Sequence, residues 1–179
     1  MTATQPAGAV PASLPLTQLL YADFDAEFAT TRRFLERYPA GKDDWRPHPS
    51  SRPLRTLANH VADLTGRGTL ILETDERDAA AVAPRPEVGT AAELVALLDA
   101  NVARFRTVLA GTDFAALERP WTLRMGPRII VQEKKRLLLR TMLMSHLVHH
   151  RAQLGVYYRL LGLPVPGAYG PSADEPLKP

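Results

Sequence analysis

Two histidines, His146 and His150, stand four residues apart in a segment rich in apolar residues. On a helix with about 3.6 residues per turn they lie on one face, one turn apart. The same face carries Leu139, Met142, Leu143, Gln153, Tyr157, Leu160 and Leu161. A buried imidazole needs a partner, and neutral imidazole is the commonest metal ligand in proteins. The pair therefore indicates a metal site, and the alternative is a pair of histidines that serve only the core or the surface.

A third histidine, His60, shares a helical face with Leu57, Leu64 and Ile71. It can meet His146 and His150 if the two helices are neighbours, since facing helices of a bundle often build metal sites. Three imidazoles leave at least one coordination position for water or substrate, as in catalytic zinc sites. Nickel or iron would also accept three imidazoles. The sequence therefore predicts a metal centre of His60, His146 and His150.

The other two histidines fit this centre less well. His149 lies about 60° around the helix from His146, so it could replace His150, but His150 lies nearer the middle of the apolar face. His48 stands between Pro47 and Pro49, which predicts a loop residue and not a ligand. Leu147 follows His146, so the glutamate of the H-E-x-x-H metalloprotease motif is missing.

Three charged residues fall on or near the apolar faces. Asp63 could orient an imidazole or simply face solvent. Arg67 could bind an anionic substrate, although an exposed or ion-paired arginine is the favoured interpretation. Glu27 could act as a base or a support for a metal ligand, but a carboxylate that snorkels or pairs at the edge of the apolar face is the favoured interpretation.

Composition indicates a globular chain. Its 179 residues are 45% hydrophobic and 23% charged, which fits a single domain with a sizeable core. The absence of cysteine excludes disulfides and thiolate metal sites, so a reacting thiol would have to come from a substrate or cofactor.

Charge and hydropathy limit the classes of partner that the chain is expected to have. The net charge is +3, and basic residues concentrate at Arg124, Arg128, Lys134, Lys135, Arg136 and Arg140. No helix-turn-helix or zinc-finger spacing accompanies them, so a solvated helix face is expected and no nucleic-acid partner. No apolar run approaches the roughly 20 residues that span a bilayer. The first 13 residues lack Lys and Arg, unlike a signal peptide. These features predict a soluble, cytoplasmic protein with no membrane partner.

Four helical stretches must position the histidines. They run from near Pro15 to Tyr38, from about 51–53 past Ile71, from a capping box at Thr90 to Gly111, and from about Gln132 to Leu161. Residues 112–131 read as a long connection with short extended pieces, and Trp45 as a plug at the bundle end. The prediction is an all-α four-helix bundle with long inter-helix connections and undetermined helix order. It comprises a disordered tail (1–13), one domain (14–175) and a C-terminal tail (176–179).

Several motifs resemble the DinB / YfiT-like family of metal-dependent enzymes. They are Trp45-Arg46-Pro47, Leu57-Ala58-Asn59-His60 and the block from His146-Leu147-Val148-His149-His150-Arg151-Ala152-Gln153-Leu154 through Tyr157-Tyr158-Arg159-Leu160-Leu161-Gly162, Pro164-Val165-Pro166 and Tyr169-Gly170-Pro171-Ser172-Ala173-Asp174-Glu175. The resemblance covers roughly residues 16–175, and the last block is its specific part. Ala152 stands where the family often has glycine, which a helix interior tolerates.

The resemblance implies a four-helix bundle, often a homodimer, with a zinc, nickel or iron site on His60, His146 and His150. The family looks related to transferases and isomerases that use low-molecular-weight thiols such as bacillithiol or mycothiol. The leading hypothesis is therefore a metal-dependent enzyme for a small-molecule substrate. It would either transfer a thiol held by the metal or hydrolyse a substrate with metal-activated water. The alternative is a non-catalytic metal-binding or stress-related protein.

Overall fold

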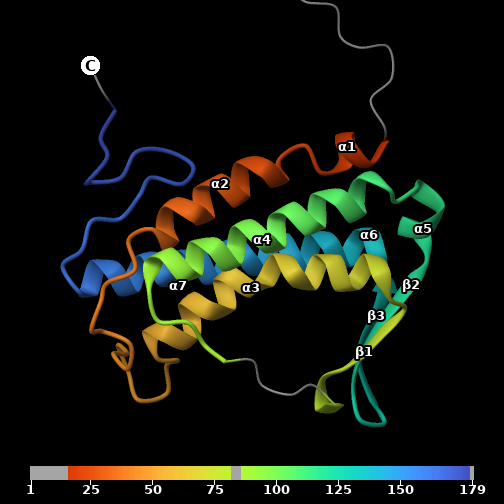
Figure 1. Cartoon of the computed structure of the whole chain (residues 1–179), viewed down its shortest axis with the longest axis horizontal. Helices are drawn as coiled ribbons and strands as arrows, with labels where there is room; N and C mark the ends of the chain where they lie inside the picture. Colours follow the sequence, from red (N-terminus) through yellow and green to blue (C-terminus); the bar gives the residue numbers. More distant parts are fainter. Residues whose placement is uncertain (1–15, 82–85, 178–179) are drawn as a thin grey trace, which may run out of the picture.

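The computed structural model describes residues 16–81 and 86–177 (Figure 1). The predicted tail of residues 1–13 and the predicted helix start at Pro15 lie outside this part. The elements are α1 (Leu16–Leu20), α2 (Phe24–Leu35), α3 (Leu54–Glu73), β1 (Glu76–Asp78), the 3-10 turn η1 (Ala79–Ala81), α4 (Ala91–Ala110), α5 (Phe114–Glu118), β2 (Pro120–Met125), β3 (Arg128–Lys134), α6 (Lys135–Leu138), the π-helix η2 (Leu139–Ser145) and α7 (His146–Leu160).

Four long helical segments form the bundle, as predicted. Both α2 and α3 pack against α4 and α7, and the buried apolar side chains of all four form one core. The helices that carry His60 and the His146–His150 pair are therefore neighbours (Figure 1). This packing meets the geometric condition of the metal hypothesis.

The third predicted helix begins and ends at the predicted residues. Thr90 Oγ1 accepts a hydrogen bond from the Glu93 amide at 3.2 Å, and Glu93 Oε2 accepts one from the Thr90 amide at 3.0 Å. These two bonds form the capping box, and Gly111 caps the other end of α4. Because each bond satisfies a backbone or side-chain group at the exposed helix start, this boundary is set locally.

The first predicted helix is interrupted. The α1 helix ends at Leu20, and α2 begins at Phe24. Arg140, from η2, donates to the Leu20 carbonyl and, at 2.7 Å, to the Asp23 carboxylate. The Phe24 amide bonds to the Tyr21 carbonyl at 3.1 Å, where a continuous helix would use that of Leu20. A contact from a distant segment accompanies this break.

The all-α fold class is wrong, because extended pieces of the kind expected within residues 112–131 form strands that pair into a sheet. β2 pairs in parallel with β1 and antiparallel with β3, which gives a three-stranded sheet in the order β1-β2-β3. Two short helices, α1 and α5, also accompany the four long segments. β3 is exposed along almost its whole length, so its sequence has no alternation of buried and exposed residues. Because β3 runs to Lys134, the last helical segment begins at Lys135 and not at Gln132.

A π-helix lies inside the last helical segment, where η2 joins α6 to α7. Hydrogen bonds from residue i to i+5 widen this turn and change the direction of the residues that follow. The buried residues of α7 include Leu147, Leu154 and Tyr158, whereas Leu160 is 60% exposed. The predicted apolar face is therefore rotated in the structure, although His150 stays buried within it.

Two further features complete the fold. The ring of Trp45 packs edge-on against that of Tyr157, with 5.5 Å between ring centroids, so the loop before α3 contacts the late part of α7. Over the described ranges, no helix is both long enough and apolar enough to span a bilayer.

Candidate metal centre and adjoining pocket

The three predicted histidines meet between α3 and α7. His60 Nε2 lies 3.3 Å from His146 Nε2, and His150 Nε2 lies 2.8 Å from His146 Nε2. Nitrogen atoms that share a tetrahedral zinc ion at about 2.0–2.1 Å stand about 3.3 Å apart. One ligand atom from each histidine lies within 4.8 Å of those of the other two. The three imidazoles are therefore close enough together to be candidate ligands of one divalent ion.

Neighbouring groups orient two of the rings. His150 Nδ1 donates to Gln153 Oε1 at 2.7 Å, and the His146 imidazole hydrogen-bonds the backbone carbonyl of Met142. Bonds of this kind fix the tautomer that leaves the other ring nitrogen free to bind a metal. Met142 lies in the π-helix, so the irregular turn supplies the acceptor for His146.

Burial and neighbouring positive charges keep the three imidazoles of the cluster unprotonated. Burial, followed by the positive charge of Arg67, lowers the pKa of His60 to about 3. Burial, followed by the charge of His150, lowers the pKa of His146 to about 4, and burial also lowers the pKa of His150. All three imidazoles are therefore neutral at pH 7, which is the form that binds metals.

The remaining candidates lie where the favoured interpretations placed them, with one exception. His149 is exposed and outside the cluster, and His48 is exposed in a loop. Glu27 pairs with Arg151 at 2.7 Å. Arg67 is the exception because it is half-buried, and within the described ranges it hydrogen-bonds His60 and no carboxylate.

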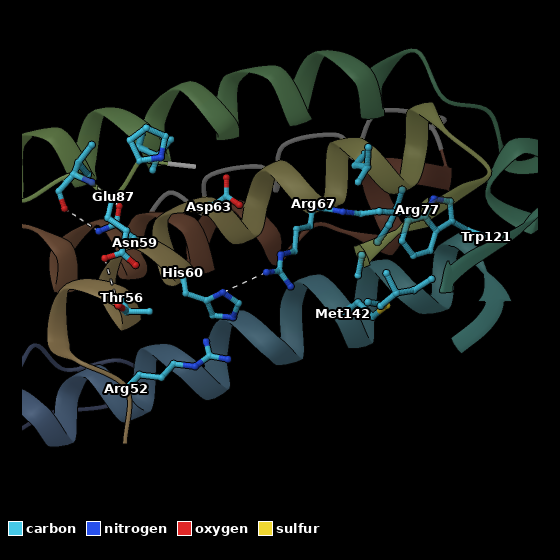
Figure 2. Close-up of a pocket in the computed structure, with 17 residues that line it drawn as sticks. Arg52, Thr56, Asn59, His60, Asp63, Arg67, Arg77, Glu87, Trp121 and Met142 are labelled. Atoms are coloured by element: carbon cyan, nitrogen blue, oxygen red, sulfur yellow. Dashed lines mark hydrogen bonds between the residues drawn. The ribbon is translucent and has the colours of Figure 1, made fainter. Parts of the chain in front are cut away.

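A pocket of about 530 Å³ adjoins the cluster (Figure 2). His60 and Met142 line it, whereas His146 and His150 do not. Its polar wall includes Arg52, Thr56, Asn59, Asp63, Arg67, Arg77 and Glu87, and its apolar wall Leu70, Ile71, Leu97, Trp121, Leu123 and Met142. Asp63 therefore lines the same pocket as the candidate ligand His60.

Sequence reasoning missed several of these wall residues. Arg77 lies on β1, and Leu123 lies opposite it on β2. The indole of Trp121 is buried and donates to Thr74 Oγ1 at 2.9 Å, which fixes its ring beside the end of α3. No local pattern marks these residues, because the sheet that brings them to α3 joins segments more than 40 residues apart.

Comparisons with known proteins agree with this architecture. The sequence model of the DinB superfamily matches residues 23–154. A DinB-like protein of Bacillus subtilis is 18% identical, with a TM-score of 0.64 over 84% of this chain and 97% of that chain. A DinB-like protein of Bacillus cereus is 19% identical, with a TM-score of 0.63 over 84% and 95%. At such identities the solved structures show a shared fold alone. No curated protein matches the sequence.

Proposed function

Because the chain belongs to the DinB superfamily, we propose that His60, His146 and His150 bind one divalent metal ion and that the protein is a metal-dependent enzyme for a small molecule. The observation that carries this proposal is the convergence of three neutral imidazoles beside a pocket. Zinc, nickel and iron are the candidate ions, since each accepts three imidazoles.

A bound divalent ion would supply Lewis acidity, which lowers the pKa of a water or thiol at its open position. The chain itself contributes orientation, through Gln153 on His150 and the Met142 carbonyl on His146. It also contributes a partly apolar pocket that can hold a substrate next to His60.

Transfer of a low-molecular-weight thiol is the reaction class that the donor set supports best. Within the described ranges, the three-residue cluster has no carboxylate to serve as a general base. A thiol needs no such base once it has ionised, and the chain has no cysteine of its own to compete for the ion. Hydrolysis is the second candidate, because Asp63 on the pocket wall could accept a proton from water.

Metal content tests the centre. The purified protein should hold about one divalent ion per chain. His60→Ala, His146→Ala and His150→Ala should each weaken zinc binding at least tenfold, since each removes one of the three protein ligands. His149→Ala is the matched control on the same helix and should bind zinc normally. Unchanged metal content in all three single variants would refute the centre.

Spectroscopy separates the reaction classes. Cobalt-substituted protein should develop a sulfur-to-metal charge-transfer band when the correct low-molecular-weight thiol is added. Ester hydrolysis that is lost on metal removal, without such a band, would favour the hydrolase. If both signals are absent, the result would favour the non-catalytic metal-binding or stress-related protein.

We propose also that the protein is a cytoplasmic homodimer. The support for the homodimer is the family resemblance of the sequence. Light scattering at micromolar concentration should give twice the mass of one chain, and a monomer would refute it.

A further inference from the structure

The pocket wall beside the histidines carries an excess of positive charge. Three arginines, Arg52, Arg67 and Arg77, face two carboxylates, Asp63 and Glu87, among the described lining residues. A divalent ion on the histidines would raise the excess from one charge to three. Asp63 offsets part of this charge, since it favours the protonated form of Arg67. The positive charge that Asp63 does not offset calls for an anion from outside the chain.

Two of these arginines lie close to the metal centre. Figure 2 shows the side chains of Arg52 and Arg67 reaching toward His60 from two sides. One pocket is lined by Arg52, Arg67 and His60, and the Arg67 guanidinium is within hydrogen-bond distance of the His60 ring. A group bound between these two guanidinium groups would therefore lie beside the metal ligands.

The hydrogen bond of Arg67 depends on which nitrogen of His60 carries the proton. Arg67 Nη2 lies 3.3 Å from His60 Nδ1. A guanidinium group only donates hydrogen bonds, so Nδ1 must accept. A neutral imidazole that binds a metal through Nε2 carries its proton on Nδ1, which then cannot accept. Metal binding at Nε2 therefore removes this acceptor and leaves the Arg67 donors available to the pocket.

The part of the pocket farther from His60 carries apolar side chains, with Arg77 beside Trp121 (Figure 2). Trp121, Leu123 and Met142 line it together with Leu70 and Ile71 of α3. A ligand that satisfies both parts needs a charged head and an apolar body. The forked donors of arginine match the oxygen atoms of carboxylates and phosphates.

We propose that this pocket binds a small organic oxyanion, whose carboxylate or phosphate group lies on Arg67 and Arg52 and whose apolar body packs against Trp121, Leu123 and Met142. This inference rests on the proposed metal-dependent function in placing the charged head beside His60. It assigns Arg67 as the residue that selects anions over neutral molecules of equal shape.

Calorimetry with three probes tests the assignment on the zinc-loaded protein. Benzoate and phenyl phosphate are the anions, and benzamide is the neutral molecule of the same shape as benzoate. At least one anion should bind at least tenfold more tightly than benzamide, and the tighter of the two identifies the head group. Arg67→Gln should reduce this preference at least tenfold, with benzamide binding and zinc content unchanged.

Arg104→Gln is the matched control, because Arg104 lies on α4 outside the pocket and pairs with Glu73 at 2.8 Å. This variant should keep the full preference for the anion. Equal binding of anions and benzamide, or an Arg67→Gln variant that behaves like the unaltered protein, would overturn the anion pocket.

The same experiment separates this inference from the metal centre. An unaltered protein that binds neither zinc, nickel nor iron but still prefers benzoate to benzamide, through Arg67, would refute the metal centre and support the anion pocket. A zinc-loaded protein without such a preference would refute the anion pocket and leave the metal centre intact.

Discussion

Two arginines with restricted access to solvent, Arg151 and Arg67, have opposite surroundings. Arg151 on α7 is 2% exposed and pairs with the Glu27 carboxylate at 2.7 Å. It also donates to the Glu27 carbonyl at 3.1 Å and to the Tyr169 hydroxyl at 2.9 Å. Arg67 on α3 lines the pocket, and its hydrogen bond within the described ranges goes to an imidazole nitrogen.

The difference shows that burial alone does not assign a role to a charge. The cluster of Glu27, Arg151 and Tyr169 satisfies its own charges, and it joins α2, α7 and the C-terminal segment. Arg67 has a partner that metal binding would remove. Buried charges are normally paired, so a charge that is poorly paired beside a pocket is a candidate for ligand binding.

The largest loss of stability is expected when the cluster of Glu27, Arg151 and Tyr169 is broken. Arg151→Met would leave the Glu27 carboxylate, whose side chain is 14% exposed, without its counter-charge. We expect the free energy of unfolding to fall by about 3–5 kcal/mol, as for other broken buried pairs. Urea unfolding followed by circular dichroism measures it.

The control for this variant is Arg159→Met on the same helix. Arg159 pairs with Asp174, and its side chain is 50% exposed, so the loss should be within about 1 kcal/mol. Similar losses in the two variants would show that burial of the pair does not distinguish them.

Acid should destabilise the metal-free folded protein through the buried histidines. In the metal-free folded protein burial holds the pKa of His60 at about 3 and that of His146 at about 4, below their ordinary value of 6.5. Below pH 6.5 the unfolded chain takes up protons that the folded chain does not. The free energy of unfolding should therefore fall as the pH decreases from about 6.5 toward about 4, and this contribution should level off near pH 3.

Thermal unfolding across this pH range measures the effect. Replacing both His60 and His146 by glutamine should flatten the dependence, because glutamine does not titrate. His149→Gln, which alters an exposed histidine, should leave it unchanged. An equal slope in the double variant would contradict the assignment.

The smallest effect is expected at Arg67. Arg67→Met removes a guanidinium group whose burial disfavours its charge, and it breaks no carboxylate hydrogen bond within the described ranges. Stability of the metal-free protein should change by no more than about 0.5 kcal/mol. Urea unfolding beside Arg151→Met gives the direct comparison, and a loss of 2 kcal/mol or more would make Arg67 a structural residue.

The spacing of His146 and His150, the apolar face around His60 and the capping box at Thr90 were sufficient to predict helices α3, α4 and α7 and the candidate ligands. Each of these features is local, because a helix places residues four apart on one face whatever surrounds it. The family motifs, which extend beyond α7 to Glu175, predicted the superfamily that the sequence model then matched.

Long-range contacts decided the features of the fold and of the pocket that local patterns did not predict. The break before α2 coincides with Arg140 contacts from more than 100 residues away, and the pocket wall combines α3 with strands that pair Arg77 with Leu123. β3 carries no alternating pattern because both of its faces are exposed. The sequence thus determined which residues share a helical face, since backbone geometry sets that within a few residues. Only the tertiary structure decided that Arg77, Trp121 and Leu123 line the pocket beside α3, because pairing and packing between distant elements set where the sheet lies.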